Sequence, residues 1–255
     1  MRLIFVGDVA VDRIPDSLGD PPRIFEEASL VLANLEGAIL RHEDRNLVSG
    51  RGSLALFNSI RVLEVLKAFR VGSVSLANNH IFDLPLPIGQ TKAILSEAGI
   101  ESFGAGVSLA EAKEPLTFAE DGASVKVFSF GWEVVGCPSA QKNRPGVNPL
   151  TPEHTVETIR RVRARDAASF IIFVMHWNYE LELYPQPAQR QLAHDLIAEG
   201  VDAIVGLHSH VAQGRELVNG KPILYGLGNW FFPARQLGHL HLAFPPISRR
   251  QLALE

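Results

Sequence analysis

The sequence predicts an α/β fold in a single domain. Short continuous apolar runs rich in Val, Ile and Leu recur along the chain, and segments with helical periodicity lie between them. Such runs are typical of strands buried on both faces, and their alternation with helices is typical of α/β proteins. A chain of 255 residues that is 46% hydrophobic can bury one sizeable core. Because no internal repeat or linker interrupts it, residues 1–255 are expected to form one domain.

The strands are predicted at the apolar runs that end in turn or polar residues. These runs are residues 3–6, 30–33, 73–77, 100–103, 125–130, 170–175 and 201–207. Near the C-terminal end, Asn219-Gly220 is a two-residue turn signal and predicts a hairpin between residues 215–218 and 223–225.

Four helices are predicted from their caps and apolar faces. They start at Asn58 with an apolar face through Phe69, cover residues 87–98 before Gly99, start at Thr151-Pro152, and run from Gln186 or Pro187 to Glu199 before Gly200. The arginines at 160, 161, 163 and 165 are interpreted as a solvated helical face rather than a phosphate site. Residues 133–150 lack periodicity, and we expect an irregular loop in which substrate selectivity resides.

Charge and composition exclude several classes of partner. The net charge of −4 gives no electrostatic reason to expect nucleic acid or an anionic membrane as a partner. The lone Cys137 excludes an intrachain disulfide and fits a reducing compartment. The apolar run Leu3–Val6 is too short for a signal-peptide core, and no other stretch approaches a membrane span. We therefore expect a cytoplasmic protein.

Potential metal ligands follow five of the apolar runs. They are Asp8, Glu36, Asn79 with His80, His176, and His208 with His210. Residues two apart in an extended segment face the same side, so His208 and His210 are expected to point together. Each residue alone is also explained by an ordinary turn, a solvated surface or a partner in the core. Five at the same topological position favour one site beyond the carboxyl ends of the strands.

The mixture of carboxylate, amide and imidazole predicts the kind of metal. Such donors suit Mn, Fe or Zn rather than a thiolate site. Seven candidates exceed what one tetrahedral ion needs. They fit two ions roughly 3.5–4 Å apart that share a bridging carboxylate and activate water, as in phosphoryl-transfer enzymes. Two divalent metal ions are therefore the expected cofactors.

Short motifs occur in a fixed order between residue 3 and about residue 232. They are Gly7-Asp8-Val9 with Arg13, Asn34-Leu35-Glu36, Ala77-Asn78-Asn79-His80 with Asp83, His176-Trp177, Gly206-x-His208-x-His210-Val211, and Tyr225-Gly226-Leu227-Gly228-Asn229. Together they resemble the CapA family of poly-γ-glutamate capsule synthesis proteins, which are relatives of the calcineurin-like metallophosphoesterases. The resemblance implies a four-layer α/β/β/α sandwich of the metallo-dependent phosphatase type, with a dinuclear site between the loops of two sheets.

The resemblance also implies a ligand set. It assigns the first metal to Asp8 and His210, the second metal to Asn79, His176 and His208, and the bridge between them to Glu36. In the wider superfamily the first metal gains a histidine from an Asp-x-His motif. Here Val9 and Ala10 follow Asp8, so that ligand is missing. We expect the first metal to be weakly held, or to be completed by water or substrate.

Four further residues receive roles from the resemblance. His80 matches a proton-donating histidine, and Asp83 is expected to orient it. Arg13 is expected to contact an anionic substrate, and Asn229 is expected to line the substrate pocket.

The functional hypothesis is a metal-dependent hydrolase, phosphoesterase-like, that acts on an anionic small molecule or polymer and is linked to poly-γ-glutamate or capsule metabolism. Hydrolysis of an amide such as a γ-glutamyl bond uses similar activation and stays open. The first alternative is a non-catalytic accessory protein that binds an anion or polymer for capsule assembly. The second alternative is that the histidines are structural and bind no metal.

Overall fold

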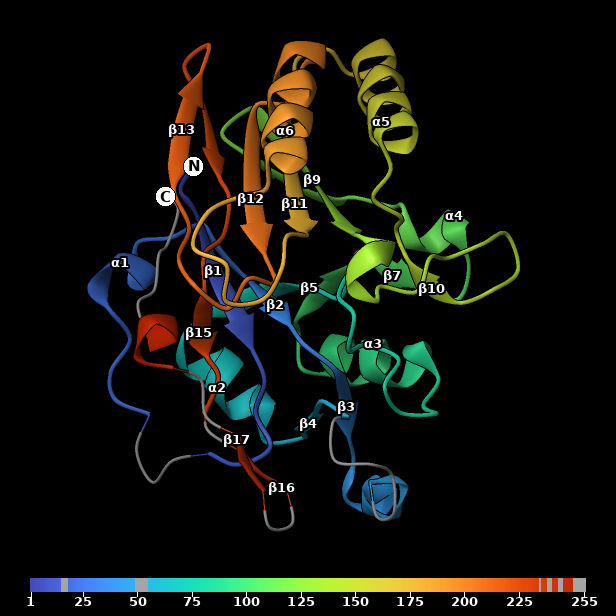
Figure 1. Ribbon diagram of the computed structural model, residues 1–255, viewed down its shortest axis with the longest axis vertical. Coiled ribbons are helices and arrows are strands. Elements are labelled where there is room, and N and C mark those ends of the chain that lie inside the picture. Colours follow the sequence, from blue (N-terminus) through green and yellow to red (C-terminus); the bar gives the residue numbers. More distant parts are fainter. Residues whose placement is uncertain (15–17, 49–54, 234, 238–239, 243–244, 250–255) are drawn as a thin grey trace.

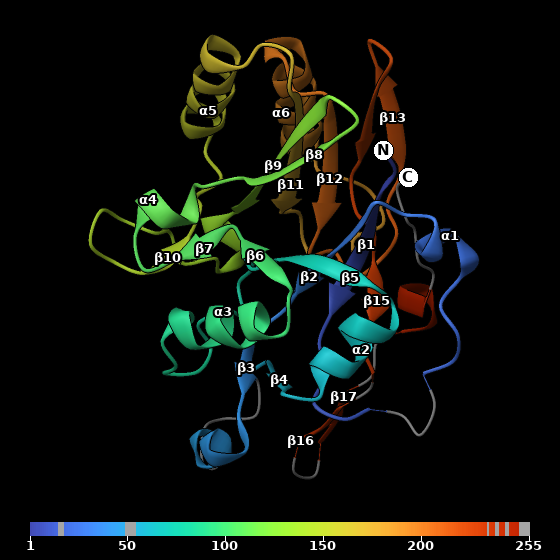
Figure 2. The ribbon, with the colours of Figure 1, turned by 180° about the vertical axis from the view of Figure 1, so that it is seen from behind.

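The computed structural model describes residues 1–14, 18–48, 55–233, 235–237, 240–242 and 245–249. In these residues two large β-sheets lie against each other, and helices cover the outer face of each (Figures 1 and 2). The layers run helix, sheet, sheet, helix. This confirms the expected four-layer α/β/β/α sandwich.

The first sheet has the strand order β15-β1-β2-β5-β6, and all of these pairings are parallel. Its strands are β1 (Leu3–Val9), β2 (Leu30–Leu35), β5 (Val71–Ser75), β6 (Glu101–Phe103) and β15 (Asn229–Phe231). The helices on its outer face are α1 (Arg23–Glu26), α2 (Val62–Ala68) and α3 (Ile88–Glu97).

The second sheet has the order β13-β14-β12-β11-β9-β8, with parallel pairs in the centre and an antiparallel strand at each edge. Its strands are β8 (Leu116–Glu120), β9 (Ala123–Gly131), β11 (Phe170–His176), β12 (Ala203–Leu207), β13 (Arg215–Val218) and β14 (Lys221–Leu224). The helices α5 (Pro152–Arg165) and α6 (Pro187–Glu199) cover its outer face.

Alternation along each strand explains why the central strands are continuously apolar. In β1, Ile4 and Val6 pack toward the helices, whereas Phe5 belongs to the core between the two sheets. In β11, Phe173 packs toward its helices and Val174 enters the same central core. Since both faces of these strands are buried, most of their positions are apolar.

Shorter elements connect the layers. They are the strands β3 (Ala38–Leu40), β4 (Phe57–Ser59), β7 (Ala105–Gly106), β10 (Gly146–Val147), β16 (Arg235–Leu237) and β17 (Leu240–Leu242), the helix α4 (Leu109–Ala112), and the 3₁₀ helices η1 (His42–Leu47), η2 (Glu133–Val135) and η3 (Pro246–Arg249). None of the helices in the described ranges combines the length and the apolar character that a membrane span requires.

Several local predictions are confirmed. The side chain of Thr151 accepts a hydrogen bond from the first turn of α5, as expected of an N-cap residue. Gly200 ends α6 with a φ of 119°, which is a conformation that favours glycine. Asn219 and Gly220 both have positive φ and join β13 to β14 in the predicted hairpin.

Two local predictions are wrong. Asn58 caps no helix: it lies in β4, and α2 begins at Val62 without a side-chain cap. Arg163 does not belong to a solvated face, because its guanidinium donates to the carbonyl of Ser169 and to the carboxylate of Asp202, both at 2.6 Å. In both cases the local pattern predicted the wrong role, because the side chain forms hydrogen bonds with residues distant in the sequence.

The segment 133–150 is only partly irregular. It contains η2 and β10, and it buries Cys137, Val147 and Leu150, whereas Val134 is exposed. The buried residues of this segment are therefore held by packing. The role of the segment in substrate selectivity stays a prediction.

Candidate metal centre

The predicted ligands meet where strands of the two sheets end. Asp8, Glu36 and Asn79 come from β1 and from the residues after β2 and β5, whereas His176, His208 and His210 come from β11 and from the turn after β12. His176 Nε2 lies 2.9 Å from Asn79 Oδ1 and 3.9 Å from Glu36 Oε1. His210 Nδ1 lies 3.4 Å from Asp8 Oδ2. The structure thus brings all six into one cluster across the sheet interface.

A close backbone approach positions Asp8. The Asp8 amide donates to the carbonyl of Gly228 at 3.0 Å, and a Cβ placed on Gly7 would lie 1.8 Å from that oxygen. Only glycine at position 7 permits this approach of the two chain segments. The register then places Asp8 beside Asn34 in β2 and Asn229 in β15.

One amide orients both buried carboxylates. Asn34 Nδ2 donates to Asp8 Oδ1 at 2.8 Å and is 3.3 Å from Glu36 Oε1. Both acids are completely buried. Burial, followed by the charge of Asp8, raises the pKa of Glu36 to about 7. Two buried carboxylates this close repel each other, so a cation between them is strongly favoured.

Two asparagines hold the backbone at Glu36. Asn58 Nδ2 donates to the carbonyl oxygens of Glu36 and Gly37, at 2.7 and 3.1 Å, and its Oδ1 accepts from the amide of Val11. Asn78 Nδ2 donates at 2.8 Å to the carbonyl that precedes Glu36. These bonds explain why Asn58 lies in the core: it fixes the chain that presents the predicted bridging carboxylate.

His176 and His208 lie side by side at the ends of the neighbouring strands β11 and β12. Their ring centroids are 4.6 Å apart. Burial, and then the neighbouring His208 and His210, lower the pKa of His176 well below its ordinary value. Burial and His210 likewise lower the pKa of His208 to about 4. Both imidazoles are therefore neutral at pH 7, which is the form that binds metal.

The expected reason for the common direction of His208 and His210 is wrong. The strand β12 ends at Leu207, and both histidines lie beyond it with φ values of 80° and 55°. The backbone is left-handed at both positions, so alternation along a strand does not apply. A sharp turn, rather than an extended segment, brings the two imidazoles into the cluster.

His210 is oriented by its Nδ1. This atom lies 2.7 Å from Asn229 Oδ1 and 3.4 Å from Asp8 Oδ2, while Nε2 lies 4.0 Å from Glu36 Oε2. Burial lowers the pKa of His210, but the carboxylates of Glu36 and Asp8 and the Asn229 contact outweigh it and raise the pKa to about 9. The surroundings thus favour positive charge at this point. Asn229 orients a predicted ligand, and its contact with substrate stays a prediction.

The donor set fits divalent cations. Within the described residues, Asp8 Oδ2, Glu36 Oε2, His176 Nδ1 and His208 Nδ1 are buried without a hydrogen-bond partner. Ligand atoms of Asp8, Glu36 and His176 also lie within 4.8 Å of one another. Leaving a buried polar atom unpaired costs about 1–3 kcal/mol, and more for a charged one. Four such atoms in one cluster are accounted for if they coordinate cations.

His80 and Asp83 form the predicted pair beside this cluster. His80 Nδ1 lies 2.8 Å from Asp83 Oδ2, and that oxygen also accepts from the amide of Leu56. Burial lowers the pKa of His80, but the Asp83 hydrogen bond and the charge of Glu36 raise it overall. His80 Nε2 accepts from Asn79 Nδ2 at 3.1 Å. To reach a substrate, Nε2 has to exchange this amide for the substrate atom.

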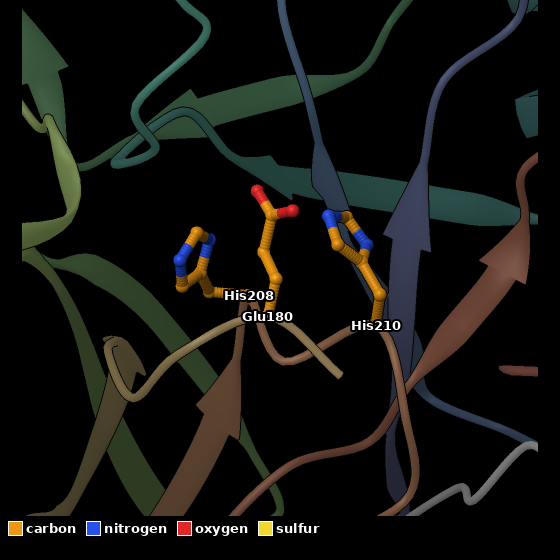
Figure 3. Close-up of side chains that lie close together, drawn as sticks. All are labelled: Glu180, His208 and His210. Atoms are coloured by element: carbon orange, nitrogen blue, oxygen red, sulfur yellow. The ribbon is translucent and has the colours of Figure 1, made fainter. Parts of the chain in front are cut away.

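Two further residues bear on the site: Arg13, which lies outside the cluster, and Glu180, which the sequence analysis did not predict. Arg13 is exposed in the loop after β1, and none of the hydrogen bonds among the described residues of the cluster involves it. Its role stays a prediction. Glu180 was not predicted, yet its carboxylate points between His208 and His210 (Figure 3). It follows His176 by four residues, so the rule that selected strand ends would have reached it if extended into the loop.

The two facing sheets, with polar donors at their shared edge, define a fold of the metallo-dependent phosphatase type. A solved 5'-nucleotidase precursor from Thermus thermophilus aligns with a TM-score of 0.50 over 90% of this chain and 48% of that chain. The sequence identity is 16%, so this likeness concerns the fold.

The family is more specific. This chain belongs to the bacterial capsule synthesis protein PGA_cap family, whose model matches residues 2–234. The predicted resemblance is thus confirmed.

Curated relatives agree with this family. The PGA biosynthesis protein CapA of Bacillus subtilis (strain 168) is 29% identical over 241 residues, which cover 89% of this chain and 62% of that protein. A probable polyglutamine synthesis accessory protein of Mycobacterium tuberculosis is 35% identical over 174 residues, covering 64% of this chain and 46% of that protein. The chain therefore spans about half to three-fifths of the length of these relatives.

Proposed function

We propose that this protein is a metal-dependent hydrolase that carries two divalent ions, of Mn, Fe or Zn type, and cleaves a phosphoester-like bond in an anionic substrate. One observation carries the proposal. Within the described residues, buried side-chain atoms without hydrogen-bond partners occur in four members of one cluster that is built from both sheets: Asp8, Glu36, His176 and His208. The mixed oxygen and imidazole donors match these metals.

The protein's own groups supply orientation and proton transfer. Divalent ions at this site would activate water and neutralise charge in the transition state. Asn34 and Asn229 fix the direction of Asp8 and His210, so the donors are held before any ligand arrives. His80, held by Asp83, is the group that protonates the leaving atom.

The site and the relatives support the proposed substrate class. A site rich in cations selects an anion, and Arg13, exposed beside β1, is the residue we assign to a more distant negative group. The relatives are named for PGA and capsule biosynthesis. The substrates to be screened are therefore anionic small molecules and polymers that contain a phosphoester or a γ-glutamyl amide.

A second candidate is a non-catalytic accessory protein that binds an anionic polymer. The name of the Mycobacterium tuberculosis relative, an accessory protein of polyglutamine synthesis, favours it. It uses the same cluster of charged residues, but it predicts saturable binding of poly-γ-glutamate without turnover of any substrate.

The first test is elemental analysis of protein purified without chelator. We expect about two Mn, Fe or Zn ions per chain, the number of a bridged dinuclear centre, and fewer in His208→Ala.

The second test is the turnover of His80→Ala. This variant should keep its ions and lose about 10²–10⁴-fold in kcat on the phosphoester or γ-glutamyl panel, which is the usual contribution of a general acid.

Each outcome decides between the candidates. Ions with turnover that depends on His80 support the hydrolase. Ions with polymer binding but no turnover establish the accessory protein. If the protein takes up no metal even after reconstitution, the hydrolase proposal is wrong.

A further inference from the structure

The loop between β11 and α6 places a third potential ligand against the two histidines of the turn after β12. The carboxylate of Glu180 and ring nitrogens of His208 and His210 all lie within 4.8 Å of one another. Figure 3 shows the carboxylate directed into the space between the two rings. His208 and His210 are buried, whereas Glu180 is exposed and closes the cluster on its solvent side.

Backbone and side-chain hydrogen bonds hold this loop on the histidine turn. The amide of Leu181 donates to the carbonyl of Ser209, the residue between the two histidines, at 2.8 Å. Gln213 Nε2 donates to the carbonyl of Glu182 at 2.9 Å, and Asn178 Nδ2 donates to Gln213 Oε1 at 3.0 Å. The residues on both sides of Glu180 in the sequence are therefore hydrogen-bonded, and they hold its backbone near the turn.

The loop adopts rare backbone conformations on both sides of Glu180. Asn178 and Leu181 have φ values of 67° and 63°. Asparagine tolerates the left-handed region, but leucine rarely occurs there, and such strain costs about 1–3 kcal/mol. Strain of this size persists where the surroundings enforce it, and here it directs Glu180 at the cluster.

The proposed ligand set is uneven without Glu180. Four residues, Glu36, Asn79, His176 and His208, are assigned to the second metal, but the first metal has only Asp8, Glu36 and His210. The residue two positions after Asp8 is Ala10, which is fully buried and offers no ligand atom. The first metal therefore has one protein donor fewer than the second, three against four.

We propose that Glu180 is a metal ligand and supplies this fourth donor to the first metal. The proposal rests on the dinuclear site of the proposed function. It assigns the loop between β11 and α6 a direct part in metal binding, whereas the strand ends alone would leave the first ion with three donors.

The test is metal binding by chelator-treated protein. Wild-type protein, Glu180→Gln and the control Glu182→Gln are titrated with Co²⁺ or Zn²⁺ against a chromophoric competitor, and bound ions are counted after desalting. Glu182 is exposed in the same loop and its substitution removes the same charge, so long-range electrostatics change equally. The visible absorption of Co²⁺ reports the coordination number directly.

We expect Glu180→Gln to keep one ion and to bind the other at least about tenfold more weakly, because loss even of a group that only supports a ligand costs about 10–100-fold. Its Co²⁺ spectrum should change, and Glu182→Gln should match wild type. Equal affinities and spectra for wild type and Glu180→Gln would overturn the inference while leaving the dinuclear site intact. Absence of metal from wild type would overturn both, and two ions without turnover would overturn the hydrolase alone.

Discussion

His208 and His210 hold left-handed backbone conformations in the turn after β12, with φ values of 80° and 55°. A residue with a Cβ pays about 1–2 kcal/mol in that region, whereas glycine does not. The chain therefore keeps histidine where the backbone favours glycine. This conformational cost is consistent with the metal-binding role that we propose for both imidazoles.

The energetic cost of the left-handed backbone at His208 can be measured in metal-free protein. We expect His208→Gly to be more stable than His208→Ala by about 1 kcal/mol, since both lose the ring and only alanine retains the strain. Urea unfolding in the presence of chelator gives the two free energies of unfolding.

His176 is the matched control, because it lies in the regular strand β11. There the order should reverse, and His176→Gly should be less stable than His176→Ala by about 0.5–1 kcal/mol. The same order at both positions would show that left-handed strain at His208 does not contribute to stability.

At the scale of elements, Asp202 joins three of them behind the site. Its carboxylate accepts from the amide of Ile171 in β11, from Arg163 in α5 and from Lys221 in β14. Burial raises the pKa of Asp202, but these bonds outweigh it and lower the pKa below its ordinary value. The ionised form is thus the one that connects the helix layer to the sheet.

The lowered pKa fixes the sign of a pH effect. A group with a lower pKa in the folded state stabilises fully above its unfolded pKa, and this contribution is lost as the pH falls through the folded pKa. We expect Asp202→Asn to lower the free energy of unfolding by about 1–2 kcal/mol at pH 7, a value reduced for partial exposure.

The difference should shrink when urea unfolding is repeated below about pH 4, near the ordinary pKa of an aspartate. Asp195→Asn, an exposed substitution in α6, is the control and should change little. A difference for Asp202→Asn that is independent of pH would show that its charge is not the cause.

Elements and strand-end ligands were predictable because they depend on local rules. Asp8, Glu36 and His176 stand where an apolar run stops, and the sequence shows that directly. Asn58 was misassigned because asparagine also favours helix caps, and only contacts with Glu36 and Val11 reveal its place. Similarly, Glu180 and the direction of His210 depend on a loop and a turn that meet through long-range hydrogen bonds. No local pattern encodes such contacts.

At the scale of the whole molecule, the candidate centre joins the two sheets. Outside it, their contacts include the apolar core with Phe5, Leu32, Val174 and Val205 and a hydrogen bond between Ser75 and Ser129. If ions bind the proposed ligands on both sheets, they stabilise the sandwich as a unit. A ligand that binds only the folded state adds about 2.7 kcal/mol at one hundred times its Kd.

For a chain of this size, that gain corresponds to a rise in Tm of roughly 5–10 °C on adding Mn²⁺ or Zn²⁺ to chelated protein. Differential scanning calorimetry provides the measurement. Asp8→Asn, in the first sheet, and His208→Ala, in the second, should each reduce the shift. An unchanged shift in both variants would place the stabilising ion elsewhere.

The distance along the chain between the donors has a consequence for biosynthesis. Asp8 leaves the ribosome about 200 residues before His210, which is roughly 10–40 s at 5–20 residues per second. The first sheet is itself incomplete until β15 pairs with β1. A nascent chain therefore has no finished site until β15 has been made, and the ions of the proposed centre would be captured only after that point. The metals found in the mature protein should record which ions were available where its folding ended.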